Sequence, residues 1–331
     1  MAVLRIGLIG AGRIGQIHGR TVAGHPRARL VAVADALPEA ARALAESTGA
    51  EARAAEAILA ADDVDAVLIG SPTDTHADLI ERAARGAKAI FCEKPVSLDS
   101  ARTEACLRVV AEADVALMIG FNRRFDPSFA NVRARIAAGE VGRVELVTIL
   151  SRDPSPPPVD YIGRSGGLFR DMMIHDFDMA RFLLGEEPVE VHAVGSSLVD
   201  PEIGAAGDVD TAAVLLKTAS GAIAQISNSR RAAYGYDQRV EVHGSLGLIQ
   251  AGNRHQTTVA FADARGYATD PALPFFLERY ADAYRLEIDA FVAGVLDGAP
   301  LSPTGGDGLA AQRLADAATQ AVRTGQPVRL A

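Results

Sequence analysis

The sequence predicts a two-part α/β protein: a parallel sheet flanked by helices, then an α+β part with a large, open, mostly antiparallel sheet. Up to about residue 120, short apolar strands alternate with amphipathic helices, which is typical of parallel sheets with right-handed crossovers. Beyond residue 120, strands are grouped between helices, as in α+β domains. The chain has 331 residues, more than one hydrophobic core normally serves. We therefore expect two domains, over residues 1–120 and 121–331.

In the first domain each predicted strand is a short apolar run and each predicted helix has apolar residues at helical spacing. The predicted strands cover residues 3–9, 30–34, 65–70, 88–92 and 115–120, and the predicted helices cover residues 16–23, 38–47, 78–85 and 100–113. Because parallel strands end at one edge of the sheet, we expect the segments that follow them to face a common ligand.

The pattern changes after Phe121. A predicted helix over residues 128–138 leads into a long strand over residues 143–151, and the prolines between Pro154 and Pro158 force an extended loop. The remaining predicted elements are a helix over residues 171–184, a run of strands between residues 189 and 260, and helices over about 275–296 and 308–324. Strands separated by Gly, Asp and Asn turns indicate a largely antiparallel sheet.

The composition excludes several classes of partner. The formal net charge is −9, and an acidic surface repels nucleic-acid phosphates and anionic lipid. No apolar run approaches the roughly 18 residues that span a bilayer, and the first residues enter a strand pattern without a signal-peptide pattern. Cys92 and Cys106 fall in a predicted strand and helix, so we expect reduced, buried thiols. We expect a cytoplasmic protein that binds neither nucleic acid nor membrane.

A glycine-rich turn, Gly10–Gly15, joins the first predicted strand to the first helix and fits the dinucleotide-binding fingerprint. In that fingerprint Gly10 permits a tight turn, Gly12 lets a pyrophosphate approach the backbone, and Gly15 lets helix and strand pack closely. The helix N-terminus offers unpaired N–H groups to the phosphates. Glycines also punctuate ordinary turns, but here the strand–turn–helix context favours a cofactor site.

Asp35 ends the second predicted strand, 20 residues after Gly15. A carboxylate at this place accepts hydrogen bonds from the adenosine ribose hydroxyls and repels a 2′-phosphate. The next residue is Ala36 rather than an arginine that could bind such a phosphate. The sequence therefore predicts NAD rather than NADP. The alternative is that Asp35 only begins the turn into the next helix.

Two further segments follow strands of the predicted parallel sheet. The segment Ser71–His76 is expected to face the cofactor, and it can also begin a helix with Asp74 or Thr75 as the N-cap. The segment Glu93–Pro95 follows another strand and falls at the same edge.

Lys94 is unusual because the chain contains 30 arginines but only three lysines, at positions 88, 94 and 217. Where only positive charge is needed, this chain uses arginine. A lysine at a strand's carboxyl end therefore indicates chemistry that arginine does not provide, such as releasing a proton. The alternative, an ordinary solvated lysine, fits Lys88 better than Lys94.

A second candidate site follows the proline-rich loop. On the helix predicted over residues 171–184, Asp171, His175 and Asp178 are four and three residues apart and share one face. That face can hold an imidazole between two carboxylates, and histidine is a suitable base for alcohol oxidation near neutral pH. The alternatives are a structural histidine and half of a metal site. No third and fourth ligand occurs at metal-site spacing, so we expect no metal.

At this point the sequence resembles the Gfo/Idh/MocA family, which includes glucose–fructose oxidoreductase, inositol dehydrogenase and rhizopine-catabolism proteins. The resemblance covers nearly the whole chain and depends on the glycine turn, Glu93–Pro95, Gly120–Asp126 and Asp171-x-x-x-His175. The stretch from Ser165 to Asp176 is most similar to inositol 2-dehydrogenases. The resemblance implies a Rossmann domain and an open-sheet domain through which homodimers or homotetramers assemble.

The resemblance also implies residue roles. Lys94, Asp171 and His175 would form the catalytic group, with His175 as the base, Asp171 orienting it, and Lys94 bonding the reacting hydroxyl or relaying its proton. The residues implied to bind the cofactor are Gly10, Ala11, Gly12, Arg13, Ile14, Asp35, Ser71, Pro72, Thr73, His76, Glu93, Lys94 and Arg123. The residues implied to bind substrate are Lys94, Arg123, Asp153, Asp171, His175, Asp178, Tyr234, Tyr236 and Tyr284. For any single tyrosine, the alternative is packing with a hydrogen bond at its tip.

These inferences predict NAD-dependent oxidation of a cyclic polyol, with myo-inositol to 2-keto-myo-inositol (scyllo-inosose) as the leading reaction. Asp153 stands where some inositol enzymes are expected to have asparagine, which leaves the epimer open. The alternatives are a dehydrogenase of scyllo-inositol, another inositol or an aldose, a non-catalytic NAD- or sugar-sensing regulator, and a scaffold protein. A regulator is expected to lose Lys94, Asp171 and His175, whereas this chain has all three. The intact glycine turn and the Glu93–Pro95 motif argue against a scaffold.

Overall fold

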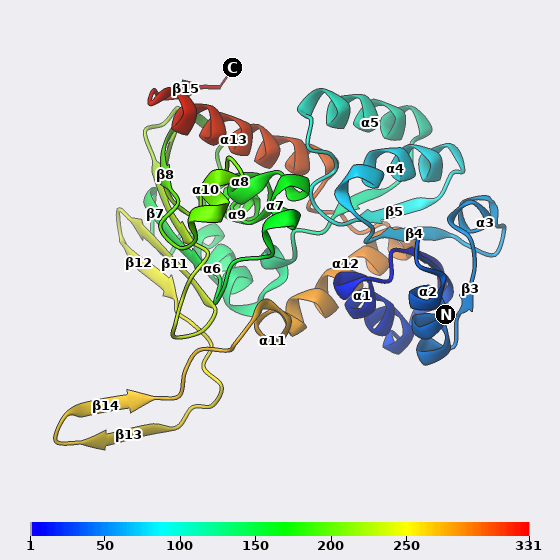
Figure 1. The fold of residues 1–331 in the computed structure, drawn as a ribbon, viewed down its shortest axis with the longest axis horizontal. Coiled ribbons are helices and arrows are strands. Elements are labelled where there is room, and N and C mark those ends of the chain that lie inside the picture. Colours follow the sequence, from blue (N-terminus) through cyan, green and yellow to red (C-terminus); the bar gives the residue numbers. More distant parts are fainter. Residues whose placement is uncertain (1, 331) are drawn as a thin grey trace. The chain divides into compact units, whose positions relative to one another are not determined.

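The computed structural model describes residues 2–330 and divides the chain into two compact units (Figure 1). The first unit contains the residues up to Phe125 together with Asp282–Gln312, and the second contains Asp126–Ala281 and the residues from Arg313 on. The sequence predicts one boundary near residue 120. In the structure the chain returns to the first unit because helix α12 (Ala281–Asp297) contributes apolar side chains to its core. Helical spacing shows that a face is buried, but not which sheet it covers.

A six-stranded parallel sheet forms the centre of the first unit. Its strands are β1 (Leu4–Ile9), β2 (Ala28–Ala34), β3 (Glu51–Ala52), β4 (Ala66–Ile69), β5 (Ala89–Cys92) and β6 (Leu117–Ile119). They lie in the order β3-β2-β1-β4-β5-β6, and every neighbouring pair is parallel. The predicted parallel sheet is confirmed. Only β3 is absent from the prediction, because its two residues are exposed and form no apolar run.

Helices cover both faces of this sheet (Figure 1). They are α1 (Arg13–Gly24), α2 (Pro38–Thr48), α3 (Ala55–Ala60), α4 (His76–Arg85), α5 (Ser100–Ala113) and α12, with 3-10 turns η1 (Thr73–Thr75) and η2 (Asn122–Phe125). On one face, α1, α2 and α12 share a core with β1 and β2, and the Phe91 and Phe291 rings lie 5.8 Å apart. On the other face, α3 packs so closely that a Cβ at Gly7 would lie 2.3 Å from Ile58 Cγ2.

Lys88 corrects the expectation of an ordinary solvated lysine. It is only 7% exposed, and its Nζ donates hydrogen bonds to the carbonyl oxygens of Ala61 (2.7 Å) and Val64 (2.8 Å). These carbonyls follow α3, where helix ends leave acceptors unpaired. A compact ammonium with three donors can satisfy both at once. A lysine in this arginine-rich chain can therefore have a structural role, as Lys88 does, as well as a chemical one.

The expectation for the two cysteines is confirmed. Cys92 and Cys106 are both buried and free. Burial raises the pKa of the Cys92 thiol well above its ordinary value and raises that of Cys106 to about 12. Neither sulfur is available as a thiolate near neutral pH.

A seven-stranded sheet forms the centre of the second unit. Its strands are β7 (Val144–Arg152), β8 (Pro188–Ser196), β9 (Thr211–Thr218), β10 (Ile223–Ser229), β11 (Asp237–Gly244), β12 (Gly247–Ala251) and β15 (Val328–Arg329). They lie in the order β12-β11-β7-β10-β9-β8-β15. Within the described residues the β7–β10 pair alone is parallel. The predicted large, mostly antiparallel sheet is confirmed.

One face of this sheet is covered by helices and the other is open. The helices of this unit are α6 (Pro127–Ala137), α7 (Val159–Ser165), α8 (Gly167–Asp171), α9 (Ile174–Leu184), α10 (Pro201–Ala205) and α11 (Phe276–Arg279), while α13 (Gly305–Thr324) begins in the first unit and ends in the second. Helix α9 packs on β7 and β10. Along β9, buried and exposed residues alternate, so Leu215 (47% exposed) lies on the open face. The exposed hairpin of β13 (Ala260–Asp263) and β14 (Gly266–Thr269) extends away from the sheet (Figure 1).

The turn between β1 and α1 gives the first testable prediction. A Cβ at Gly15 would lie 1.9 Å from the Gly10 carbonyl oxygen, whereas a Cβ at Gly24, at the end of the same helix, meets no atom within 4 Å. We expect Gly15→Ala to lower the free energy of unfolding by about 1–3 kcal/mol because helix and turn must separate. Gly24→Ala is the control and should be neutral or stabilise by up to about 1 kcal/mol. Thermal melts measure both, and equal melting temperatures for the two variants would contradict the close contact.

Candidate active site

The glycine turn lies at the point where the strand order reverses, between β1 and β4. Gly10 has φ +106°, and a Cβ there would lie 2.4 Å from the Ser71 nitrogen, so the two strand-end loops touch at Gly10. The Asp35 carboxylate fixes the turn by accepting the Ala11 N–H (2.6 Å) and the Leu37 N–H (2.8 Å). In doubly wound sheets, ligands bind at such a reversal point, outside the carboxyl ends of the strands.

The turn fits a dinucleotide phosphate. A Cβ at Gly12 would meet no atom within 4 Å, so the space above this residue is open. Gly12 is also the N-cap of α1, and no side chain caps the helix there. The first N–H groups of the helix are thus available to an anion, whose charge the helix dipole favours.

The segment Ser71–His76 is tied together by its own side chains. Thr75 is the N-cap residue of α4, as predicted, but its hydroxyl bonds Ser71 Oγ (2.6 Å) and the Pro72 carbonyl (2.7 Å) instead of capping the helix. His76 is buried, with Nδ1 2.7 Å from the Pro95 carbonyl and Nε2 2.8 Å from the Ser71 carbonyl. Burial lowers the pKa of His76. The structure therefore places this residue between two loops, which it joins.

The second of these loops begins immediately after β5. Glu93 donates its N–H to the Ile69 carbonyl (2.9 Å), and its carboxylate accepts a hydrogen bond from His18 Nε2 (2.7 Å). A Cβ at Gly120 would lie 3.1 Å from that carboxylate, so no side chain fits there without displacing it. Lys94 follows and is half-buried, and Arg123 is buried on η2.

In the second unit, the prediction of one continuous helix over residues 171–184 is wrong. Helix α8 ends at Asp171 and α9 begins at Ile174. The N–H groups of Met172 and Met173 both donate to the Leu168 carbonyl (3.1 and 2.9 Å), which interrupts the regular ladder. His175 and Asp178 therefore share α9, whereas Asp171 precedes the turn.

Two residues that the sequence analysis missed hold Asp171. Tyr161 donates its hydroxyl to Asp171 Oδ1 (3.2 Å), and Arg230 Nη2 lies 3.5 Å from Oδ2. Arg230 is 1% exposed and follows β10, while Tyr161 lies on α7. The Asp171 carboxylate is thus oriented by one side chain from α7 and one that follows β10.

Further acidic residues lie around His175 in the sequence, and their contacts differ. Asp178 is buried, with Arg181 Nη1 3.7 Å from its Oδ1. Asp176 accepts a hydrogen bond from Asn228 Nδ2 (2.9 Å), which joins α9 to β10. Asp153 follows β7 and donates its backbone N–H to the Ser229 carbonyl (3.0 Å).

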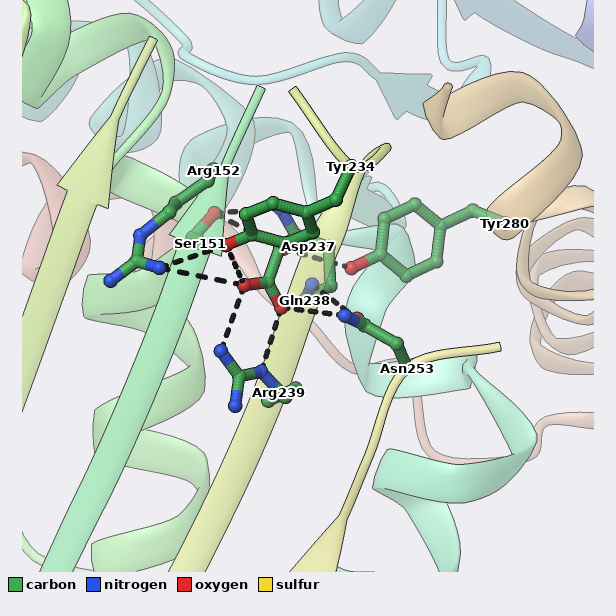
Figure 2. A network of polar contacts seen from close by, with 8 residues as sticks. All are labelled: Ser151, Arg152, Tyr234, Asp237, Gln238, Arg239, Asn253 and Tyr280. Carbon is green, nitrogen blue, oxygen red and sulfur yellow. Dashed lines mark hydrogen bonds and ion pairs between the residues drawn. The ribbon is translucent and has the colours of Figure 1, made fainter. Parts of the chain in front are cut away.

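The three predicted substrate tyrosines occupy different environments. Tyr234 is half-exposed, and its hydroxyl donates to Asp237 (2.6 Å) and accepts from Arg152 (2.9 Å), as Figure 2 shows. Tyr236 is buried, with its ring 6.0 Å from that of Tyr280. Tyr284 is buried on α12 of the first unit.

The network around Tyr234 is centred on Asp237, which is fully buried and is the first residue of β11 (Figure 2). Burial alone would raise the pKa of this carboxyl, but hydrogen bonds from Arg239, Tyr234 and Asn253 outweigh it and lower the pKa. The network fixes Tyr234 at this end of the sheet.

Two residues near Glu93 were also missed by the sequence analysis. His18 is one helical turn after Gly15, on the helix that begins at the glycine turn. Glu287 is a fully buried carboxyl beside Ile288, Phe291 and Val292 on α12. A charged residue within an apolar helix face is a signal that a sequence can provide.

Comparison with known proteins finds relatives over nearly the whole chain. Residues 4–121 match the model of the oxidoreductase family with an NAD-binding Rossmann fold, and residues 129–250 match the GFO/IDH/MocA C-terminal domain. The chain is 58% identical to the inositol 2-dehydrogenase of Rhizobium meliloti (strain 1021), over 99% of both chains. It is 46% identical to the myo-inositol 2-dehydrogenase of Thermotoga maritima, over 99% of this chain and 98% of the other.

Solved structures agree with the fold. A myo-inositol dehydrogenase from Corynebacterium glutamicum has a TM-score of 0.96 at 46% identity, covering 99% of each chain. A scyllo-inositol dehydrogenase from Lactobacillus casei with bound NAD(H) and scyllo-inositol has a TM-score of 0.92 at 30% identity, also covering 99% of each chain.

The open space at Gly12 gives the second prediction. We expect Gly12→Ala to keep the melting temperature of the cofactor-free protein, because its Cβ meets nothing. The same Cβ would occupy the space into which the pyrophosphate moves, weakening NADH binding by about 1–3 kcal/mol. A fluorescence titration with NADH measures the affinity. Unchanged affinity would show that the phosphates do not approach this turn.

Proposed function

This chain belongs to the Gfo/Idh/MocA family of NAD-binding oxidoreductases, and we propose that it oxidises myo-inositol to 2-keto-myo-inositol. The observation that carries the choice of substrate is full-length similarity to inositol dehydrogenases in a chain that has Lys94, Asp171 and His175 together. Fold alone does not determine function in this architecture, so these side chains carry the argument.

The first unit is the NAD-binding part of the protein. When bound, NAD accepts the hydride from a ring carbon. The Gly10–Gly15 turn and α1 would hold its pyrophosphate, and Asp35, at the end of β2, would accept the ribose hydroxyls. Asp35 also holds the Ala11 N–H, so the same carboxylate shapes the turn.

The proton of the reacting hydroxyl requires a base, because an alcohol becomes a ketone only when both its C–H hydride and its O–H proton leave. We assign the base to His175 and its orientation to Asp171. Tyr161 and Arg230 support this role by fixing the Asp171 carboxylate. Lys94 is assigned to bond the same hydroxyl or relay its proton.

The alternative within the same chemistry is oxidation of scyllo-inositol. It is favoured by the similarity to a scyllo-inositol dehydrogenase that has scyllo-inositol and NAD(H) bound. Asp153, Asp178 and the buried Arg123 are the polar side chains that we assign to reading the hydroxyl pattern of the ring.

We also propose that copies of this chain assemble through the open face of the seven-stranded sheet. Val194 (69% exposed), Leu215 (47%) and Ile223 (39%) lie on neighbouring strands β8, β9 and β10. An exposed apolar sheet face of this kind is typical of an interface between subunits. A dimer or tetramer would cover it. No helix within residues 2–330 is long and apolar enough to cross a membrane.

We propose a cytoplasmic location from the two free, buried cysteines, because thiols stay reduced in that compartment.

Activity is tested by NADH formation at 340 nm with NAD or NADP and myo-inositol, scyllo-inositol, chiro-inositol, glucose or xylose. We expect NAD-linked turnover of myo-inositol. His175→Ala should lower kcat by roughly 10²- to 10⁴-fold because the base is lost. Lys94→Arg keeps the charge but not the ammonium geometry, and it should also lose most of the turnover.

The controls for these variants are Lys217→Gln and His243→Gln, which change exposed residues on β9 and β11. Both should keep kcat. If the His175→Ala variant kept near-normal turnover, His175 would not be the base. If the protein bound NADH but turned over none of these compounds, a non-catalytic NAD- or sugar-sensing regulator would be favoured.

Assembly is tested by light scattering after size-exclusion chromatography. The unsubstituted protein should have the mass of a dimer or tetramer. Leu215→Asp should lower that mass because a charge is placed on the buried interface, whereas Tyr267→Asp, on the exposed hairpin, should not. A monomeric unsubstituted protein would contradict the proposal.

A further inference from the structure

Three side chains from different parts of the first unit meet at the start of the Glu93–Pro95 loop. His18 comes from α1, Glu93 follows β5, and Glu287 comes from α12. His18 Nε2 lies 2.7 Å from Glu93 Oε1 and 3.9 Å from Glu287 Oε1. The side chains of His18 and Glu287 are 0% exposed, and that of Glu93 is 12% exposed. The proposed reaction does not itself use His18 or Glu287.

His18 connects the two parts of the cofactor region. It lies one helical turn after Gly15, whose position against Gly10 is fixed by contact. Because a carboxylate oxygen only accepts, Nε2 carries the proton that binds Glu93. Glu93 immediately precedes Lys94, so this hydrogen bond links the phosphate-binding helix to the loop that carries the lysine.

The rings around His18 restrict its orientation. The Phe91 ring lies 5.1 Å away and the Tyr284 ring 5.7 Å away, both edge-to-face. Opposite the imidazole, the Glu93 carboxylate packs against Gly120, where a Cβ would lie 3.1 Å from it. The imidazole and the carboxylate therefore have little freedom to move apart.

Glu287 completes the cluster as a neutral acid. Neither of its buried oxygens has a hydrogen-bond partner among the described residues. Burial, followed by the charge of Glu93, raises the pKa of this carboxyl well above its ordinary value. A protonated Glu287 leaves Glu93 as the cluster's single carboxylate, which His18 can satisfy.

We propose that His18 is a positioning residue for the reaction, and that it holds the Glu93 carboxylate and the adjoining Lys94 in place, with the buried side chain of Glu287 beside it. The inference rests on the proposed function, because it gives the position of Lys94 a catalytic consequence. His18 itself acts only through Glu93.

The first test compares two substitutions of His18. His18→Leu removes the donor and should lower kcat by roughly 10- to 100-fold, since small displacements of reacting groups have effects of this size. His18→Gln keeps an N–H donor at a similar place and should restore kcat to within about 3-fold of the unsubstituted protein. If His18 had a purely structural role, kcat would fall and recover only in proportion to the melting temperature. Loss and recovery of kcat at nearly equal melting temperatures therefore indicate positioning.

The matched control is His25→Leu. His25 follows the same helix, and its Nε2 lies 3.1 Å from Asp289 of α12, so it makes a similar link away from Glu93. This variant should keep kcat. If His18→Leu behaves like His25→Leu, the positioning role is overturned.

A measurement without substrate separates this inference from the proposed function. The chain has only three lysines, so biosynthetic incorporation of lysine labelled with ¹³C at its ε-carbon gives one NMR signal from each. His18→Leu should move the Lys94 signal, while those of buried Lys88 and exposed Lys217 serve as internal references. An unmoved Lys94 signal overturns the inference even if the protein turns over inositol. A moved signal without any polyol turnover overturns the proposed function alone.

The charge state of Glu287 is tested by thermal melts of Glu287→Gln between pH 5 and 8. A carboxyl whose pKa is raised in the folded state stabilises fully below its unfolded pKa, and this contribution is lost as pH rises toward the folded pKa. Gln has no such dependence. The melting temperature of Glu287→Gln minus that of the unsubstituted protein should therefore increase with pH, and a constant difference contradicts the neutral acid.

One ring nitrogen of His18 and one carboxylate oxygen each from Glu93 and Glu287 lie within 4.8 Å of one another. Atoms at these separations could instead coordinate a divalent cation. Metal analysis of the purified protein distinguishes the two cases. Stoichiometric metal that disappears in His18→Leu and Glu287→Gln would overturn the inference, and metal-free protein with full turnover supports it.

Discussion

The contact of Gly15 with the carbonyl of Gly10 is the constraint on which the first unit depends. Helix α1 can lie so close to β1 only because no side chain separates them. That approach brings the N-terminus of α1 to the sheet edge and carries His18, one turn later, to the Glu93 carboxylate. Asp35 follows β2 and accepts a hydrogen bond from the Ala11 N–H of the turn. The cofactor region is thus one packed structure rather than a set of independent loops.

In the second unit, hydrogen bonds between different helices and strands hold the candidate site residues in place. Asp171 accepts a hydrogen bond from Tyr161 of α7 and pairs with Arg230, which follows β10. Asp176 accepts a hydrogen bond from Asn228 of β10. These contacts fix the turn between α8 and α9 on which His175 depends. The base that we propose at His175 requires such support, because a catalytic side chain must be held to within about 0.5 Å by the residues around it.

The sequence predicted the features that depend on local pattern and spacing. The parallel sheet, the glycine turn and Asp35 follow from apolar runs and glycines at fixed offsets. The break at Met172 was not predictable, since it depends on two N–H groups that share the Leu168 carbonyl. Nor was the return of α12 to the first unit, or the cluster of His18 and Glu287. Those partners are up to 269 residues apart in the chain (287 minus 18), and tertiary packing alone brings them together.

The burial of both natural thiols has a practical consequence. Cys92 and Cys106 are shielded from solvent and hold their protons near neutral pH, whereas maleimide reagents attack only accessible thiolates. A cysteine introduced on the exposed hairpin, at Tyr267 for example, would then react alone. A single fluorophore can be attached there without first replacing the native sulfurs, which makes this chain convenient for site-specific labelling.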